Sequence, residues 1–198
     1  RIRRRARSER VAMARKSQNP QPVDALVTPR YGSIPTFMRL PHITDLRKLD
    51  IALVGVPWDG GTTNRAGARH GPREIRNMSS FIRKVHHVSR IAPYELARVA
   101  DVGDAPCNPI DLADSLARIE RFFARIHGRG VVPLSAGGDH LVTLPILRAI
   151  ARGRPLGLIH FDAHNDVRVL DHGPTNGTPI RGILTPGVRV AGRNLVQV

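Results

Sequence analysis

Cysteine is nearly absent, since Cys107 is the single thiol in 198 residues. One thiol excludes an intramolecular disulfide and a metal site built from several thiolates, so any metal must be held by imidazole and carboxylate groups. The scarcity of cysteine is typical of a reducing compartment, and we expect a cytoplasmic protein. No apolar run approaches the roughly 20 residues of a membrane-spanning helix, so we expect no membrane association.

Acidic residues are also scarce, with 16 Asp and Glu against 31 Lys and Arg and a net charge of +15. Taken alone, this excess favours a nucleic-acid-binding protein, which we keep as the alternative function from another class. About half of the excess lies in residues 1–16, where eight basic residues face only Glu9. We therefore interpret residues 1–22 as a disordered basic leader and expect no nucleic-acid partner. Residues 1–12 precede Met13, and whether they are native or translated from upstream sequence stays open.

Apolar patterns after the leader alternate between strands and helices. Continuous apolar runs predict buried strands, and apolar residues at helical spacing predict helices. The expected strands cover residues 50–56, 98–102, 131–134 and 155–161, and the expected helices cover residues 71–84, 111–129 and 143–151. This alternation predicts an α/β fold in which helices cover both faces of a mainly parallel sheet.

The segment His160-Phe161-Asp162-Ala163-His164-Asn165-Asp166 directly follows an apolar strand. Alternate side chains of an extended chain share a face, so Asp162, His164 and Asp166 are expected to converge beyond the strand end. Carboxylate and imidazole together suit a divalent ion such as manganese, iron or zinc. A solvated loop with incidental charges is the alternative interpretation.

A second polar segment, Ser135-Ala136-Gly137-Gly138-Asp139-His140, follows the preceding strand. Paired glycines allow a tight turn that presents His140 at the same sheet edge, although His140 alone fits an ordinary hydrogen-bonded turn residue. Together the two segments predict four metal ligands, His140, Asp162, His164 and Asp166. Four ligands are few for two metal ions, and the chain ends in the uncapped apolar run 194–198, so we expect it to stop before its metal site is complete.

Three segments resemble the ureohydrolases, the family of arginase, agmatinase, guanidino-acid hydrolases and formimidoylglutamase. They are GGDH at 137–140, HFDAHND at 160–166 and GVPWDGGTTNRAGARHGPREIR at 55–76. From Pro22 to about His164 the resemblance is closest to bacterial agmatinases. It implies a three-layer αβα fold with residues 23–198 as the N-terminal part of one domain, truncated at its C-terminus.

The resemblance also implies two Mn²⁺ ions per subunit that activate water for attack on an amidine or guanidine carbon. His140, Asp162 and Asp166 would bind one ion, and Asp162 and His164 the other. The remaining ligands of the family come from a later Asp-x-Asp segment that this chain does not contain, so we expect the 198-residue piece to be inactive by itself. A trimer or hexamer is the expected assembly.

The implied reaction is hydrolysis of agmatine to putrescine and urea, a step of polyamine biosynthesis, with Asp166 as a catalytic carboxylate. The family's proton-shuttle histidine is replaced here by Asn176, which cannot titrate and would instead contact substrate. The stretch around it is more similar to formimidoylglutamase, which makes formimidoylglutamate the alternative substrate. In that interpretation Arg168 or Arg181 pairs with the substrate carboxylate, although either could equally be a surface residue.

Overall fold

The computed structural model describes residues 19–153, 155–169, 173–185, 188 and 190–198, so most of the predicted leader lies outside the described residues. The elements, in chain order, are η1 Phe37–Arg39, η2 Leu46–Lys48, β1 Ile51–Val56, η3 Ala68–His70, α2 Gly71–Ser79, α3 Pro93–Leu96, β2 Val99–Asp104, α4 Leu112–His127, β3 Val132–Gly137, η4 His140–Val142, α5 Thr143–Ile150, β4 Leu158–His160, α6 Pro179–Leu184, η5 Gly192–Asn194 and β5 Leu195–Gln197. None of the helices in the described ranges is both long and apolar enough to cross a bilayer.

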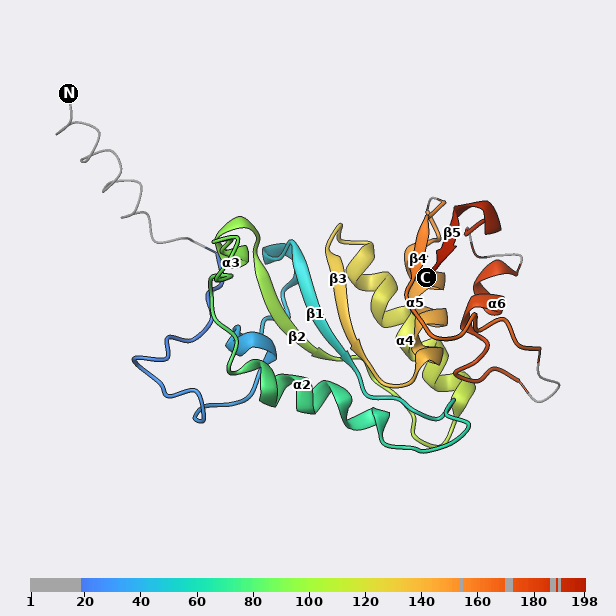
Figure 1. The fold of residues 1–198 in the computed structure, drawn as a ribbon, viewed down its shortest axis with the longest axis horizontal. Coiled ribbons are helices and arrows are strands. Elements are labelled where there is room, and N and C mark those ends of the chain that lie inside the picture. The colour runs from blue at the N-terminus through green and yellow to red at the C-terminus, as the bar shows by residue number, and fades with distance from the viewer. Residues whose placement is uncertain (1–18, 154, 170–172, 186–187, 189) are drawn as a thin grey trace, which may run out of the picture.

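The centre of the fold is a parallel sheet in the order β2-β1-β3 (Figure 1). Strand β1 pairs along its whole length with β3, from Ile51 opposite Val132 to Val56 opposite Gly137. Residues 52–56 are all buried, as expected for the middle strand of a sheet that is covered on both faces. The prediction of a parallel sheet is therefore confirmed.

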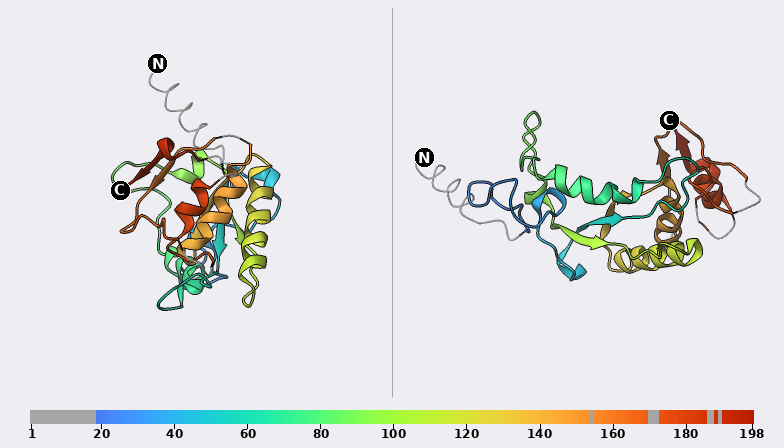
Figure 2. Two further views of the ribbon diagram at one scale, coloured as in Figure 1. Left: turned by 90° about the vertical axis from the view of Figure 1, so that its right-hand side faces the viewer. Right: turned by 90° about the horizontal axis from the view of Figure 1, so that it is seen from below.

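Helices cover the two faces of this sheet, with α2 on one side and α4 on the other (Figure 2). Helix α4 begins after Asp111, whose side chain accepts a hydrogen bond from the backbone N–H of Asp114 and so caps the helix. Its inner face buries Leu116, Ile119, Phe123 and Ile126, all at helical spacing. The predicted α/β class, with helices on both faces of the sheet, is confirmed.

The prediction of a strand over residues 155–161 is partly wrong. Strand β4 covers only Leu158–His160, and it pairs in parallel with β5 in a separate two-stranded sheet. Among the described residues no strand pairs with β3 on the side away from β1, and Val132 and Leu134 of β3 are 61% and 56% exposed. The choice of pairing partner depends on tertiary packing that the apolar pattern of one strand does not encode.

The prediction of a helix over residues 71–84 is also partly wrong, and the apolar side chains at helical spacing in this segment, Ile75, Met78 and Ile82, do not form a buried face. Helix α2 ends at Ser79, and all three apolar side chains are exposed. The helix face toward the sheet instead carries Pro72, Arg76 and Ser79, and Arg76 forms an ion pair with Asp101 of β2. The inner face of this helix thus carries an ion pair, and its apolar side chains face outward.

Candidate metal centre

A glycine turn at the end of β3 determines the position of His140. The backbone N–H of Gly138 donates to the carbonyl of Val56 at 3.2 Å, and the N–H of Asp139 donates to that of Trp58 at 2.8 Å. A Cβ atom at residue 138 would lie 2.1 Å from the Trp58 carbonyl oxygen, so only glycine allows this approach. His140, two residues after Gly138, begins the short helix η4.

The buried carboxylate of Asp139 joins this turn to the loop that follows β1. Its Oδ2 accepts a hydrogen bond from the Gly61 N–H at 2.7 Å, and its Oδ1 accepts one from the Leu141 N–H at 2.8 Å. Burial raises the pKa of Asp139, and the two N–H donors offset only part of this rise. Asp139 was not among the predicted site residues, and its structural task is to hold the turn beneath His140.

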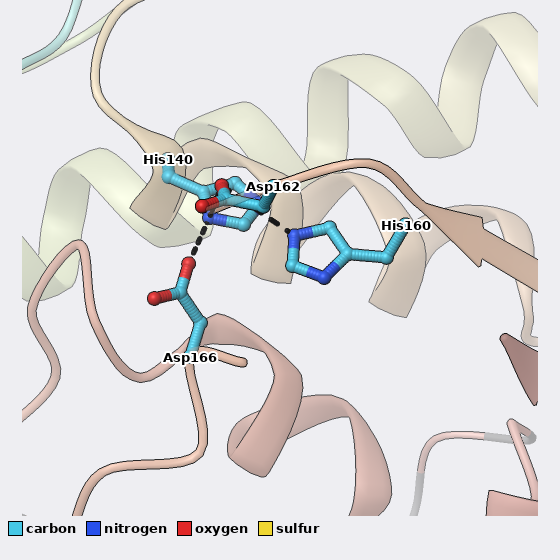
Figure 3. Close-up of side chains that lie close together, drawn as sticks. All are labelled: His140, His160, Asp162 and Asp166. Atoms are coloured by element: carbon cyan, nitrogen blue, oxygen red, sulfur yellow. Dashed lines mark hydrogen bonds and ion pairs between the residues drawn. The ribbon is translucent and has the colours of Figure 1, made fainter. Parts of the chain in front are cut away.

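Four side chains from the ends of β3 and β4 converge on one point (Figure 3). They are His140, His160, Asp162 and Asp166, and one potential ligand atom from each lies within 4.8 Å of those of the others. The Nδ1 atom of His140 forms a short contact with Asp166 Oδ2 and lies 3.6 Å from Asp162 Oδ2. The rings of His140 and His160 stack with their centroids 5.0 Å apart.

The Asp162 carboxylate lies between histidines on two sides. Its Oδ2 is 3.6 Å from Nδ1 of His140 and 3.6 Å from Nε2 of His160, whereas its Oδ1 is 3.4 Å from Nδ1 of His164. A hydrogen bond from the His164 N–H to Oδ1 lowers the pKa of Asp162, and burial offsets this in part. Asp162 is therefore an anion whose two oxygens face different imidazoles.

Asp166 reaches the cluster through a left-handed backbone conformation, with φ at 51°. Asp adopts this conformation more readily than most residues other than glycine. The N–H of Arg181 donates to the Asp166 carbonyl at 3.3 Å, which ties this turn to helix α6. The carboxylate is buried, so its contact with His140 lies in a region with little solvent.

The structure brings together His140, Asp162 and Asp166 as predicted, but leaves His164 at the margin. His164 has an 80% exposed side chain and touches the cluster through Asp162 only, so its role as a ligand stays a prediction. His160, which the sequence places in the same alternating series, belongs to the cluster. Extending the alternation of 162, 164 and 166 back by two residues would have included it.

The donor set fits a divalent metal ion. Two imidazoles and two carboxylates supply nitrogen and oxygen ligands of the kind that manganese, iron and zinc accept. The Nε2 atom of His160 is buried and has no hydrogen-bond partner among the described residues, while its Nδ1 lies 3.0 Å from Gln197 Nε2. A buried polar atom with unmet bonding capacity is unfavourable unless a ligand or water supplies the missing contact.

The predicted substrate residues lie beside this cluster. Arg168 and Arg181 line a cavity of about 320 Å³ together with Arg148, and no Asp or Glu is among its described lining residues. The Arg181 guanidinium donates to the Val167 carbonyl at 3.4 Å, adjacent to Asp166. Asn176 donates its N–H to the Gly61 carbonyl at 2.9 Å, and its Oδ1 is buried without a partner among the described residues.

Cys107 takes no part in this cluster, and we expect it to be chemically inert. Burial, with a smaller contribution from Asp104, raises the pKa of its thiol to about 11 from an ordinary value of 9.0. Because the thiolate is the reactive form, iodoacetamide at pH 8 should alkylate folded Cys107 about 100-fold more slowly than the same thiol in urea. Equal rates in folded and unfolded protein, measured by mass spectrometry, would contradict this assignment.

Comparison with protein families matches residues 49–198 to the arginase family. Three relatives are a guanidinopropionase of Pseudomonas aeruginosa, a guanidinobutyrase of the same organism and a mitochondrial agmatinase of Gallus gallus. The guanidinopropionase is 63% identical to this chain, and the match covers 87% of this chain and 55% of the relative. The guanidinobutyrase is 47% identical, with 77% of this chain and 48% of the relative covered. The agmatinase is 41% identical, with 93% of this chain and 55% of the relative covered. The chain thus spans about half the length of these relatives.

Two solved structures resemble this fold. Proclavaminate amidino hydrolase from Streptomyces clavuligerus aligns with a TM-score of 0.81 and 35% identity, covering 86% of this chain and 58% of that protein. A formiminoglutamase from Trypanosoma cruzi, solved with Mn²⁺, aligns with a TM-score of 0.71 and 26% identity, covering 83% of this chain and 57% of that protein.

Proposed function

Because the chain belongs to the arginase family, we propose that it carries the metal-binding segments of a manganese hydrolase that cleaves a C–N bond in the guanidino group of a linear guanidino carboxylate. The observation that carries this proposal is the convergence of His140, Asp162 and Asp166 from the ends of two strands. The solved structure with Mn²⁺ supports the choice of metal, and the relatives named guanidinopropionase and guanidinobutyrase support the substrate class.

Two metal positions follow from the placement of Asp162. His140, Asp162 and Asp166 would hold one ion, and the other oxygen of Asp162 would hold the second together with His164. When bound, a pair of divalent ions lowers the pKa of water to near neutrality and stabilises charge that develops on the substrate. The contribution of this chain is to fix the ligands, with Asp139 holding the turn beneath His140.

Asn176 and Asp166 would act on the substrate directly. A guanidinium group carries several N–H donors, and the unpartnered Oδ1 of Asn176 offers a buried acceptor for one of them. Asp166, as a carboxylate, can accept a proton from the attacking water, whereas the amide of Asn176 cannot titrate. Asn176 therefore orients the substrate in this proposal, and proton transfer falls to carboxylate groups.

The charge of the cavity that Arg168 and Arg181 line favours a carboxylate substrate over agmatine. Arg148, Arg168 and Arg181 line it, and its described lining residues include no acidic group. Arginine binds a carboxylate through two parallel N–H donors, whereas the free amine of agmatine would be repelled there. Formimidoylglutamate also carries carboxylates, so it stays the alternative substrate. A homo-oligomer and a cytoplasmic location stay predictions.

Turnover by the full-length purified protein, reconstituted with Mn²⁺, tests the substrate class. We expect urea release from guanidinopropanoate or guanidinobutanoate to exceed that from agmatine, and we expect Arg168→Ala to raise KM for the guanidino acid about tenfold or more, because a charge-assisted contact is lost. Arg121→Ala removes an arginine from the outer face of α4 and should leave KM unchanged. Preference for agmatine, with no effect of Arg168→Ala, would contradict the carboxylate substrate, and formamide release would favour the alternative.

A further inference from the structure

A second polar cavity lies away from the metal centre, between the segment that precedes η1 and the loop that follows α2. In Figure 1 these segments are the blue chain and the green loop on the side of the molecule opposite β4. The cavity has a volume of about 600 Å³ and adjoins one of about 320 Å³. Arg30 and Arg39 line both cavities, and Arg83, Lys84 and Arg90 line the larger one.

Arg39 is a buried cation without a counterion among the described residues. It is 7% exposed, and its Nη2 donates to the Thr28 carbonyl at 2.7 Å. Its Nη1 is also buried but has no hydrogen-bond partner in the described part of the chain. A buried charge is strongly unfavourable unless an opposite charge and hydrogen bonds compensate for it. The guanidinium of Arg39 therefore has bonding capacity that no described residue satisfies.

The surroundings of Arg39 add positive charge. Arg30, Arg83, Lys84 and Arg90 form no ion pair with any described acidic residue, whereas the ion pairs of the described chain lie elsewhere. One acidic residue, Asp24, is among the lining residues, and its Oδ1 accepts a hydrogen bond from the Leu26 N–H. Five cationic side chains thus face one acidic side chain around the larger cavity, which creates a field that attracts anions.

We propose that this cavity binds a small multivalent oxyanion, with Arg39 at its base and Arg30, Arg83, Lys84 and Arg90 around its entrance. Guanidinium groups recognise phosphate and carboxylate oxygens through paired N–H donors, and lysine adds a point charge. A cavity of about 600 Å³ has the size of sites that take small molecules. A carboxylate from a second copy of this chain has the same chemistry, and the experiment separates the two sources.

Inorganic phosphate is the probe for this site. At constant ionic strength, phosphate should raise the thermal unfolding midpoint of the purified protein, because it binds the folded state only. The double variant Arg83→Ser/Lys84→Ser changes two exposed side chains and should weaken phosphate affinity in calorimetry about tenfold or more. The variant Arg39→Gln should remove binding.

Arg73→Ser, which removes an exposed charge from α2 outside the cavity, is the control and should leave the affinity unchanged. Asp162→Asn should retain the phosphate effect, which separates this site from the metal centre.

Three outcomes would overturn the proposal. The first is a wild-type midpoint that does not respond to phosphate at matched ionic strength. The second is an unchanged affinity in Arg83→Ser/Lys84→Ser, a variant that avoids the buried Arg39 and so decides the matter even if Arg39→Gln fails to fold. The third is a fall in oligomer size in these variants, measured by light scattering, without any binding of phosphate, which would assign the site to a carboxylate of a second copy.

Discussion

Asp162→Asn is expected to abolish hydrolysis and to weaken Mn²⁺ binding about 100-fold or more. Both oxygens of Asp162 face imidazoles that would share metal ions with it, so its loss affects both proposed positions. An amide keeps the size of the side chain but removes its charge, and even residues that only support metal ligands cost 10- to 100-fold in affinity or activity when changed. Titration calorimetry with Mn²⁺ and an assay of urea release measure the two effects.

Two further variants sharpen this experiment. His164→Ala should lower the number of bound Mn²⁺ ions from two to one, because it removes a ligand from the second position alone. Asp45→Asn, which changes a partly exposed carboxylate paired with Arg47, is the control and should alter neither binding nor turnover. Full Mn²⁺ binding by folded Asp162→Asn, with its circular dichroism spectrum unchanged, would refute the metal assignment.

The sequence predicted the position of this cluster because parallel strands end at the same edge of a fold. His140 follows β3 and Asp162 follows β4, and their side chains meet although the two strands belong to separate sheets. The alternation argument was less successful, since β4 ends at His160 and the chain bends at residues 163–164. Asp166 reaches the cluster through its left-handed turn, and His164 points to solvent, neither of which a periodicity of two contains.

The error in the prediction of helix α2 has a physical cause. Apolar periodicity assumes that hydrophobic burial orients each element, and for α4 and β1 this assumption holds. Helix α2 instead turns Arg76 toward the sheet, where it pairs with a buried carboxylate, and leaves Ile75 and Met78 exposed. Such a pair joins residues that are 25 positions apart in the chain, and no local pattern reports it.

The same ion pair leads to the largest expected effect on stability. Asp101 is 1% exposed and receives two hydrogen bonds from Arg76, at 2.8 and 3.0 Å, and one each from the N–H groups of Phe37 and Gly103. The Arg76 guanidinium also contacts Asp104 and lies 4.2 Å from the centroid of the Phe37 ring. Arg76→Met leaves the Asp101 carboxylate buried without its cation and should lower the free energy of unfolding by about 3–5 kcal/mol.

Urea unfolding of matched variants measures this effect. Arg73→Met, on the exposed side of the same helix, should change stability by less than about 0.5 kcal/mol. The double variant Arg76→Met/Asp101→Asn should lose less than the sum of the two single losses, because removing both charges leaves neither one buried alone. Strictly additive losses would show that Arg76 and Asp101 do not stabilise the fold as a pair.

The pH dependence gives an independent check on the same pair. Burial raises the pKa of Asp101, but Arg76 and the two backbone N–H donors outweigh it and hold the pKa below the ordinary value of 3.8. A carboxylate with a lowered folded-state pKa contributes its stability above the unfolded-state pKa and loses it as the pH falls through the folded-state pKa. The difference in unfolding free energy between wild type and Asp101→Asn should therefore be full at pH 6 and shrink below about pH 4. A difference that stays constant down to pH 2 would mean that Asp101 acts through packing and not through its charge.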